Sequence, residues 1–563
     1  MATITITKIN QSSDSITPLP ESSFYGRKLS CKIMGAISHV ETTHSHIFII
    51  GYIQDNDYLH SKDKAEYFSN ENILDNITKL NGHYSLIKVC KNTDQFTVFS
   101  NKSGGNRVYL RQNDSQWIIS QKLSNLVTNN DTIENIALEE EFLYRWITGE
   151  HSLIKGVYQV PSGHYWLISQ DIIKEKIKYF SLPIAHPERY QNESLESLTS
   201  TTHSLLTTAL NKMVRPRKKV AILLSGGVDS SILAAMAHHA GHELVAISHR
   251  SLQHENPELN TAIKFAKTLN IEHRIIDIDD NEIACAFKQC SKIIEQAPRF
   301  QSSIILFLLF SKLEGEFYQV IYGEAADTLF GNNTLKRYLQ RYKKRQHIST
   351  IINAIPLLDN IIKLLPQNSK ISMLLNESVE DFIRSNNQLA LNDYSINYIR
   401  KITSLKKDNY SFQQLTSDLP IKPNLKNDLL KIKRFALNTD VDNHFHETGA
   451  LANHFNIEII SPFVDIDVIN FASQLPVYHT IAGDNVKPIL RKIGEMYFKS
   501  ELMYLPKKGF PAPHLKWLET CLRDYVITAA EYLNISDPNQ LDTETQWTIA
   551  ALDIVLQELN IKY

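Results

Sequence analysis

The sequence predicts an α/β protein built from two different domains, and three observations carry this prediction. Between Met34 and about Leu182, short stretches that alternate apolar and polar residues are separated by turn residues, which is typical of antiparallel strands. After residue 196 strands alternate with helical stretches, which favours a parallel sheet. Residues 218–240 run directly from an apolar strand through a Ser-Gly-Gly turn into a helix. We therefore expect an α+β N-terminal domain followed by a parallel-sheet domain.

The N-terminal part is expected to comprise an extension and one β-rich domain. Residues 1–33 are polar and loosely patterned, so they are interpreted as the extension. Residues 34–185 form the domain, with about two helices, and the polar segment 183–197 is its linker to the next domain. The expected strands of this domain are HIFIIGYI, HYSLIKVC, FTVFSN, QWIIS and HYWLIS.

The second domain is expected over residues 196–563. Its strands are predicted at 220–224, 244–249, 273–278 and 318–323. A long helical insert, residues 334–445, begins with the basic run 336–347. A solvated helix face is one reading of that run, and a docking surface for an acidic or peptide substrate is the other.

The composition excludes several classes of protein. The chain has 563 residues and a net charge of −2, so it has enough length for two or three domains and no excess of positive charge for nucleic-acid binding. The five cysteines include no CxxC pair, which argues against a disulfide framework or a zinc site. No apolar run of 18 residues and no secretory signal are present, so a cytoplasmic protein without a membrane span is expected.

The run AILLSGGVDSS, residues 221–231, predicts a binding site for the pyrophosphate of ATP with Mg²⁺. Glycines after a strand let the backbone approach a ligand, and the free N–H groups at the following helix start attract an anion. A simple strand-to-helix turn is the alternative, but the serines and the aspartate around the glycines make the run much more specific. It is not a Walker loop, because GxxxxGK[ST] is absent. The candidate nucleotide-binding residues are Ser225, Gly226, Gly227, Asp229, Ser230, Ser231 and Ser248.

Two further runs contain candidate catalytic groups. YGEAADTLFGNN carries Glu324 and Asp327 after an apolar strand, and Asp327 beside Asp229 would supply oxygen ligands for Mg²⁺. A solvent-exposed acidic loop is the alternative. In LPKKGFPAP, Lys507 or Lys508 could neutralise charge that develops during acyl transfer, although most surface lysine pairs have no such role.

Taken together, five runs resemble, in order, the synthetase domain of the asparagine synthetase family, which has the PP-loop ATP pyrophosphatase fold. The resemblance covers about residues 196–520. It implies that Ser225, Gly226, Gly227, Asp229 and Ser230 bind pyrophosphate, that Asp327 is a second Mg²⁺ ligand, and that Glu324 and Lys507 are the family's functional glutamate and lysine. The runs are SGGVDSS; NPELNTAIKFAKTLNIEH; YGEAADTLFG; HETGALANHFNIEIISPFVDIDVINFASQLP; and KPILRKIG followed by LPKKGFPAP.

The N-terminal half resembles, more faintly, the family's class II glutamine amidotransferase domain, an Ntn-hydrolase-like αββα sandwich. LNGHYSL and PSGHYWLI carry this resemblance. That domain needs a cysteine after the initiator methionine, and this position holds Ala2. The family's NGEIYN run is IGYIQD here, so Ile50 and Tyr52 replace its asparagine and glutamate. We therefore expect a degenerate domain without glutaminase activity.

These observations lead to the hypothesis of an AMP-forming ligase that joins a carboxylate to an amine without glutamine. A lasso-peptide macrolactam cyclase is favoured because family branches without the cysteine activate a carboxylate that an amine of the same molecule attacks. The substrate would be a peptide or small molecule that carries both groups, and a precursor-peptide protease is a candidate partner. An ammonia-dependent asparagine synthetase is one alternative. A β-lactam synthetase-like enzyme is the other, although such enzymes carry tyrosine where this chain has Glu324.

Overall fold

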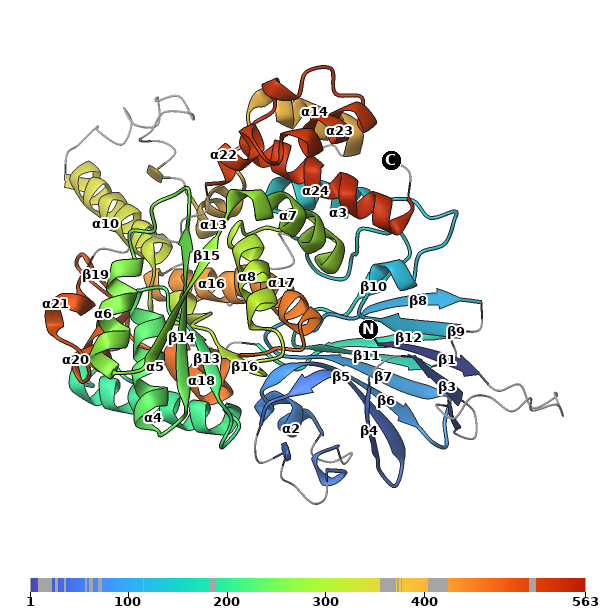
Figure 1. Cartoon of the computed structure of the whole chain (residues 1–563), viewed down its shortest axis with the longest axis horizontal. Coiled ribbons are helices and arrows are strands. Elements are labelled where there is room, and N and C mark those ends of the chain that lie inside the picture. Colours follow the sequence, from blue (N-terminus) through green and yellow to red (C-terminus); the bar gives the residue numbers. More distant parts are fainter. Residues whose placement is uncertain are drawn as a thin grey trace.

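Figure 1 shows the computed structural model of the chain, in which two stacked sheets lie beside a parallel sheet flanked by helices. The structure describes residues 2–8, 23–25, 29–34, 37–55, 58–59, 64–68, 73–114, 116–169, 171–181, 189–354, 371, 374–375, 377–403, 424–505 and 513–561.

The N-terminal sandwich consists of two antiparallel six-stranded sheets within the described residues. The order of the first sheet is β10 (Tyr158–Gln159), β8 (Tyr109–Asn113), β9 (Gln116–Ser120), β1 (Thr3–Lys8), β3 (Leu29–Met34) and β2 (Ser23–Tyr25). The order of the second sheet is β12 (Ile172–Lys178), β11 (His164–Ser169), β7 (Gln95–Ser100), β6 (Gly82–Cys90), β5 (Ser45–Ile53) and β4 (Ser38–Glu41).

Alternation along the strands builds this sandwich. On β5, Phe48 and Ile50 point into the core between the sheets, whereas Ile47 and Ile49 join the core beneath α2 (Ile73–Lys79). The outer side of the first sheet shares a core with α3 (Asn135–Tyr144), through Tyr109. The αββα layering expected from the sequence is thus formed by α2, two sheets and α3.

Residues 1–33 were expected to be an N-terminal extension, but their described residues form β1, β2 and most of β3 of the first sheet, with β1 as an inner strand. β1 pairs with β3 on one side and with β9 on the other. Its run TITITK alternates strictly, and Ile4 and Ile6 are buried between the sheets. This short alternation is the only sequence signal for the strand. The polar residues that follow it favour an extension instead.

The C-terminal domain is built on a parallel sheet of five strands. The four predicted strands are present and are joined by the short strand β17; the sheet order is β15 (Glu272–Ile278), β14 (Leu244–Ser251), β13 (Val220–Leu223), β16 (Gln319–Ile321) and β17 (Glu458–Ile460). One group of helices packs together on one side: α4 (Leu195–Met213), α5 (Val228–His239), α6 (Leu259–Leu269), α18 (Ile466–Ser473) and α20 (Pro488–Glu495). A second group contains α7 (Asp280–Ile294), α8 (Ser302–Leu313), α17 (Asp442–His454) and α24 (Thr543–Leu559).

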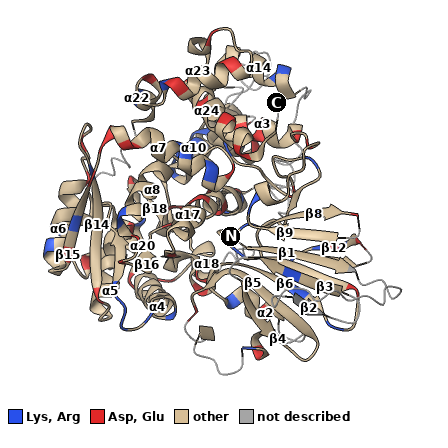
Figure 2. Ribbon diagram, turned by 45° about the vertical axis from the view of Figure 1, so that its right-hand side comes forward, with Lys and Arg blue, Asp and Glu red and all other residues tan. Residues whose placement is uncertain are grey.

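The expected insert 334–445 is mostly helical within the described residues. It contains α10 (Asn333–Ala354), α13 (Val379–Asn387), α14 (Asp393–Thr403), α16 (Leu425–Ala436) and a π-helical turn (Leu437–Val441) that leads into α17. The basic residues of α10 are visible in Figure 2. Lys336 pairs with Asp484 at 2.7 Å and Arg341 pairs with Glu377, so part of this basic run has partners inside the protein.

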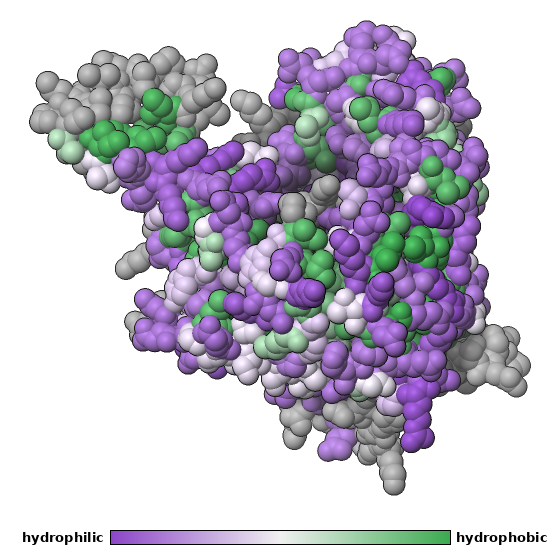
Figure 3. All heavy atoms as spheres, turned by 60° about the vertical axis from the view of Figure 1, so that its left-hand side comes forward, coloured by the Kyte–Doolittle hydropathy of each residue, from purple (hydrophilic) through white to green (hydrophobic). Residues whose placement is uncertain are grey.

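On the face shown in Figure 3, hydrophilic residues predominate and apolar residues form separate small areas. Within the described part of the chain, no helix is both long and apolar enough to cross a membrane.

Candidate active site

A cavity of about 360 Å³ opens at the carboxyl ends of β13, β14 and β16, where ligands bind in parallel sheets. Its wall contains both apolar side chains and ionisable groups. The lining includes Leu224, Ser225, Asp229, Ser230, Ile247, Ser248, Leu306, Leu309, Tyr322, Glu324, Asp327 and His444. We call this the central cavity.

The Ser-Gly-Gly turn reaches the wall of the central cavity through Ser225. Gly226 has φ +90°, and a Cβ atom on it would lie 2.4 Å from the Glu258 carbonyl oxygen, so no other residue fits. The helix α5 begins at Val228, and its N-cap residue Gly227 provides no side-chain cap, whereas α7 is closed by a capping box of Asp279 and Glu282. The first N–H groups of α5 are therefore available to an anion, and the helix dipole favours it.

The predicted serines do not all face the cavity. The hydroxyls of Ser225 and Ser230 lie 3.1 Å apart on the cavity wall. Ser248 also lines it, and its hydroxyl donates to the Leu224 carbonyl oxygen at 2.6 Å. Ser231 is fully buried, and its hydroxyl donates to the Val228 carbonyl oxygen within the helix, so it is not part of the wall.

A lysine that the sequence reasoning did not assign bridges the two predicted metal ligands. The Lys487 ammonium lies 2.5 Å from Asp229 Oδ2 and 2.7 Å from Asp327 Oδ1. Lys487 is 7% exposed and stands in the left-handed region directly before α20, with φ +61°. It belongs to the run KPILRKIG, so the run that supported the resemblance already contained this signal.

Residues of this corner fit a Mg²⁺ ion held together with phosphate. Asp229 Oδ1 is buried and has no hydrogen-bond partner, which leaves one carboxylate oxygen for a cation. Mg²⁺ is usually bound by one or two carboxylates together with substrate phosphates and water. Among the described residues, no group of three or more histidine, cysteine, aspartate or glutamate side chains could hold a metal by itself.

The second unassigned residue is His444, which pairs with the predicted catalytic Glu324. His444 Nδ1 lies 2.6 Å from Glu324 Oε2, and its Nε2 lies 3.3 Å from the Tyr322 hydroxyl. Ala325, the neighbour of Glu324, has φ +70°, a strained value for a residue with a Cβ atom. Ser461 donates a hydrogen bond to the Glu324 carbonyl oxygen at 2.9 Å and so helps to hold this turn.

The environment favours the charged forms of both partners. Burial alone would raise the pKa of Glu324, but the charge and hydrogen bond of His444 offset it, so the pKa lies below its ordinary value. Burial alone would lower the pKa of His444, but Glu324, together with Glu447 and Asp440, raises it above its ordinary value. A neutral His444 with Nδ1–H donating to Glu324 would present Nε2 as an acceptor beside the cavity.

The predicted catalytic Lys507 lies outside the described residues, as does Lys508. The structure thus brings Ser225, Asp229, Ser230, Ser248, Glu324 and Asp327 to one cavity and adds Lys487, His444 and Tyr322.

Comparison with known proteins agrees with this geometry. A family model described as asparagine synthase matches residues 201–551, more than half of the chain. The chain belongs to the asparagine synthase family. Its match begins just inside α4 and ends in α24, so it covers the whole parallel sheet and the central cavity.

The relatives are distant. Asparagine synthetase (glutamine-hydrolyzing) 1 of Bacillus subtilis is 22% identical over 425 residues, which are 74% of this chain and 65% of that protein. A provisionally named asparagine synthetase (glutamine-hydrolyzing) of Mycobacterium bovis is 21% identical over 402 residues, or 70% of this chain and 60% of that protein. The chain thus spans less than two thirds of the length of these curated relatives. The NH3-dependent NAD synthetase structure from Campylobacter jejuni aligns with 34% of this chain and 96% of that one, at 17% identity and a TM-score of 0.20.

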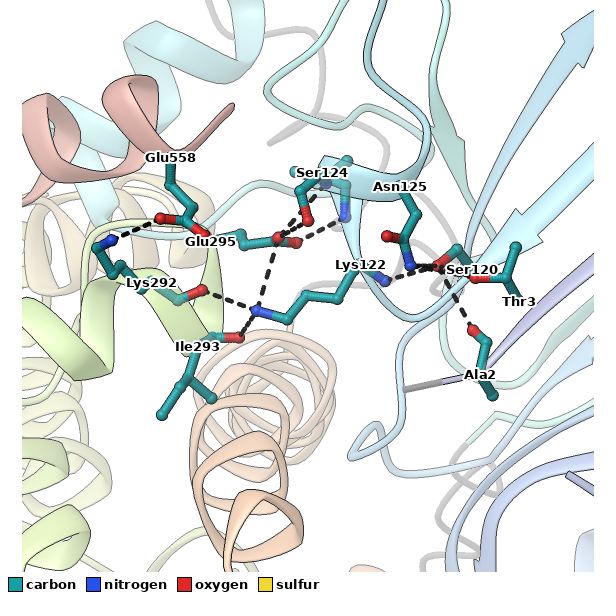
Figure 4. A network of polar contacts seen from close by, with 11 residues as sticks. Ala2, Thr3, Ser120, Lys122, Ser124, Asn125, Lys292, Ile293, Glu295 and Glu558 are labelled. Carbon is teal, nitrogen blue, oxygen red and sulfur yellow. Dashed lines mark hydrogen bonds and ion pairs between the residues drawn. The ribbon is translucent and has the colours of Figure 1, made fainter. Parts of the chain in front are cut away.

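In the N-terminal sandwich, the position at which a class II amidotransferase carries its cysteine is closed. Ala2 is 1% exposed, its N–H donates to Gln121 Oε1 at 3.2 Å, and its carbonyl oxygen accepts from Ser120. Figure 4 shows Ala2 in a polar network that continues through Lys122 to the carbonyl oxygens of Lys292 and Ile293 of the synthase-family domain. No thiol is present at this end of β1.

Cys31 does not replace the missing nucleophile. It lies on β3, which is paired with β1 and β2, and its side chain is buried between the sheets. Burial raises the pKa of the Cys31 thiol to about 12, so the nucleophilic thiolate is not formed near neutral pH.

Proposed function

We propose that this chain is an ATP-dependent, AMP-forming amide ligase that activates a carboxylate in the central cavity and couples it to an amine without using glutamine. The observation that carries the proposal is the contact between Glu324 and His444, beside the Ser-Gly-Gly turn and the Asp229–Lys487–Asp327 cluster. In this proposal, the turn at Ser225 would bind phosphate, Lys487 would neutralise the pyrophosphate from beside the lining residues Asp229 and Asp327, and His444 would be the base for an amine.

The nucleotide half of the cavity suits ATP. Leu224, Ile247, Leu306 and Leu309 supply an apolar wall for a nucleobase, while the turn and the start of α5 face the phosphates. A carboxylate oxygen of the substrate would attack the α-phosphorus, and the bond to the bridging oxygen would break as pyrophosphate leaves. Lys487 would move from the two aspartates to the departing pyrophosphate. Mg²⁺, held by Asp229 and Asp327, would neutralise phosphate charge.

The other half suits attack by an amine on the acyl adenylate. His444 Nε2 would accept the amine proton, while Glu324 holds the ring through Nδ1 and stabilises the imidazolium that forms. AMP would leave with its bonding electrons as the new C–N bond is completed. Lys507, beyond the described residues, stays a predicted donor to the tetrahedral oxyanion.

The amine is proposed to belong to the substrate itself. The buried Ala2 and the buried Cys31 supply no glutaminase nucleophile, so ammonia would not be made by this chain. Joining two ends of one molecule needs only that the cavity hold them in contact, and proximity of this kind is a large rate term. A peptide that bears an N-terminal amine and an Asp or Glu side chain meets this requirement, and its product would be a macrolactam.

A second candidate is an ammonia-dependent asparagine synthetase: the relatives that share 21–22% identity are named glutamine-hydrolyzing asparagine synthetases, and without a glutaminase nucleophile this chain would have to use free ammonia. A β-lactam synthetase-like enzyme has weaker support, because it would need tyrosine at Glu324. Here, however, the paired base is formed by Glu324 and His444.

AMP release from Mg-ATP would distinguish these candidates. Purified protein is incubated with aspartate plus ammonium, or with a mixed library of peptides that carry a free N-terminal amine and one internal Asp or Glu. The proposal predicts AMP only with peptides, and a product 18 Da lighter than its peptide by mass spectrometry. AMP with formation of free asparagine would support the second candidate, and Asp229→Ala is the negative control in both arms.

A further inference from the structure

Among the described residues, the N-terminal sandwich reaches the surroundings of the central cavity through α17 and through β17, and α17 carries His444. The helix has two faces: His444 and Glu447 point toward the synthase-family side, where Glu447 accepts from Ser303 Oγ at 2.6 Å. Asp442 and Gly449 point toward the sandwich. The spacing agrees with a helix, since residues three, four or seven apart share a face. α17 thus contacts the sandwich with one face and carries His444 on the other.

The first turn of α17 is held by charged and polar groups of the sandwich. Arg107 Nη2 lies 2.9 Å from Asp442 Oδ2 and 3.0 Å from Asn443 Oδ1. The Ser162 hydroxyl donates to Asp442 Oδ1, so both oxygens of this carboxylate have partners in the sandwich. The Arg107 and Asp442 side chains are only 9% and 11% exposed, so this ion pair is shielded from water.

One and two turns further on, at Phe445 and Gly449, α17 lies directly against His83 of β6. A Cβ atom on Gly449 would lie 2.9 Å from His83 Nδ1 and 3.2 Å from the Gly105 carbonyl oxygen. The His83 ring packs edge-on against Phe445 at a centroid distance of 5.1 Å. Burial lowers the pKa of His83 to about 4, so the ring is neutral and its close fit against the helix costs no buried charge.

The strand next to the Glu324 turn is held from the same side. Tyr52 accepts a hydrogen bond from the Ile459 N–H at 2.9 Å, and Gln54 Nε2 donates to the Ile459 carbonyl oxygen at 2.7 Å. Ile459 lies on β17, which pairs with β16 and leads to Ser461, the partner of the Glu324 carbonyl. Tyr52 stands where the NGEIYN run of the amidotransferase domain has its glutamate, and here it binds the neighbouring domain.

We propose that the N-terminal sandwich positions the base of the central cavity, with Arg107 as the main positioning residue: it fixes the first turn of α17 and thereby the contact of His444 with Glu324. This inference rests on the proposed function, because it gives the sandwich a purpose only if His444 takes part in the reaction. The positioning itself is measurable without any substrate.

The groups that face His444 are Glu324 and Tyr322 on the β16 side, Asp440 one turn earlier in the π-helical turn, and Glu447 on α17. Arg107 contacts Asp442 and Asn443, not His444. Removal of a nearby positive charge would by itself raise the pKa of an imidazole. A fall in the pKa of His444 after loss of Arg107 would therefore report a weakened contact with Glu324.

Hydrogen exchange of the full-length protein tests this. Arg107→Ala, Arg107→Lys and Arg111→Ala are compared with the wild type by mass spectrometry, for the backbone amides of 442–449 and for the C2 hydrogen of His444 as a function of pH. Arg111 is the matched control, because it lies on β8 four residues after Arg107, pairs with Asp131 of the sandwich domain and is similarly shielded, and within the described part of the chain none of its hydrogen bonds reaches α17.

We expect Arg107→Ala to speed backbone exchange in 442–449 by about tenfold and to lower the pKa of His444 toward its ordinary value. Arg107→Lys should show a smaller change, and Arg111→Ala should leave both readouts at the wild-type values. Equal exchange in wild type and Arg107→Ala, an equal increase in Arg111→Ala, or an unchanged pKa of His444 despite faster exchange would each overturn the positioning role. Failure of the proposed function is recognised separately, as absence of AMP release by the wild type with every acceptor.

Discussion

The central cavity and the end of the N-terminal sandwich that contacts β17 differ in how their buried polar groups are hydrogen-bonded. In the cavity, Asp229 Oδ1 is buried without a hydrogen-bond partner, and the first N–H groups of α5 have no side-chain cap. At the sandwich end, Tyr52 and Gln54 are buried and bonded to the Ile459 backbone. A buried polar group without a hydrogen-bond partner costs free energy, which is expected where a ligand supplies the partner. Polar groups that are bonded within the protein instead indicate a structural role.

This difference separates the residues of the central cavity from the residues of the domain interface by the expected effect of substituting them. Arg107 and Ser162 of the sandwich bind Asp442 of α17, and Tyr52 binds the Ile459 backbone of β17. In the proposed positioning role, the contacts on α17 hold His444 in place. The comparison predicts that cavity substitutions remove turnover, while interface substitutions change its rate or the stability of the protein.

The largest effect is expected at the Asp229–Lys487–Asp327 cluster. Asp229→Ala should lower AMP release by about 10³-fold or more, because it removes a ligand for the cation and a partner of Lys487. Lys487→Met should have a comparable effect on the release of pyrophosphate. The measurement is AMP formed per enzyme with the accepted substrate. Turnover within tenfold of the wild type in Asp229→Ala would place the nucleotide elsewhere.

The second largest effect is expected when the proposed base, His444, is removed. His444→Gln should slow amide formation by about 10²–10⁴-fold and leave exchange of labelled pyrophosphate into ATP close to the wild-type rate, because the proton is removed only after adenylation. Tyr342→Phe, on α10 away from the cavity, is the control. Parallel losses of both partial reactions in His444→Gln would show that His444 acts on nucleotide binding instead.

The pH dependence sharpens the same point. A base must be unprotonated, and Glu324 raises the pKa of His444, so the wild-type rate should rise with pH through a value above 6.5. Glu324→Gln removes the charge that stabilises the imidazolium, so the acidic limb should move to lower pH while the maximal rate falls by about 10²-fold. The check is kcat against pH for both proteins. An acidic limb at the same pH in Glu324→Gln would exclude His444 as the titrating base.

The smallest effect is expected at the interface strand. Tyr52→Phe leaves the Ile459 N–H without its partner and should destabilise the protein by about 1 kcal/mol while reducing kcat several-fold. Tyr84→Phe is its matched control, because the buried Tyr84 hydroxyl donates to the Ile77 carbonyl oxygen within the sandwich at 2.9 Å. It should cost similar stability and leave kcat unchanged, as measured by denaturant unfolding and steady-state rates. If both variants lowered kcat equally, the effect would be one of stability alone.

The sequence predicted those parts whose signal is local. The four longer parallel strands, the Ser-Gly-Gly turn and the meeting of Asp229 with Asp327 follow from patterns within a few residues of each motif. β17 was missed because Glu458–Ile460 is too short to show a period. β1 was missed although Ile4 and Ile6 alternate with threonines, since its neighbours are polar.

His444 could not be predicted from its surroundings in the chain. It lies 120 residues after Glu324, at the end of a region interpreted as a helical insert, and only the packing of α17 against the Glu324 turn brings the two side chains together. Lys487 lies in the run KPILRKIG, which the sequence comparison already included. A single lysine before a helix, however, does not indicate a role until its two carboxylate partners are known.

The contrast between an N-terminal sandwich without glutaminase activity and a catalytic central cavity is tested most directly by finding which compound supplies the amide nitrogen of the product. Wild-type protein is given Mg-ATP and the accepted carboxylate, with glutamine, ammonium or an amine on the same substrate as the only nucleophile, and AMP and amide product are measured together. We predict one AMP per amide with the substrate's own amine and none with glutamine. Amide formation from glutamine, with glutamate released, would contradict the account, because it requires a nucleophile that Ala2 and Cys31 do not supply.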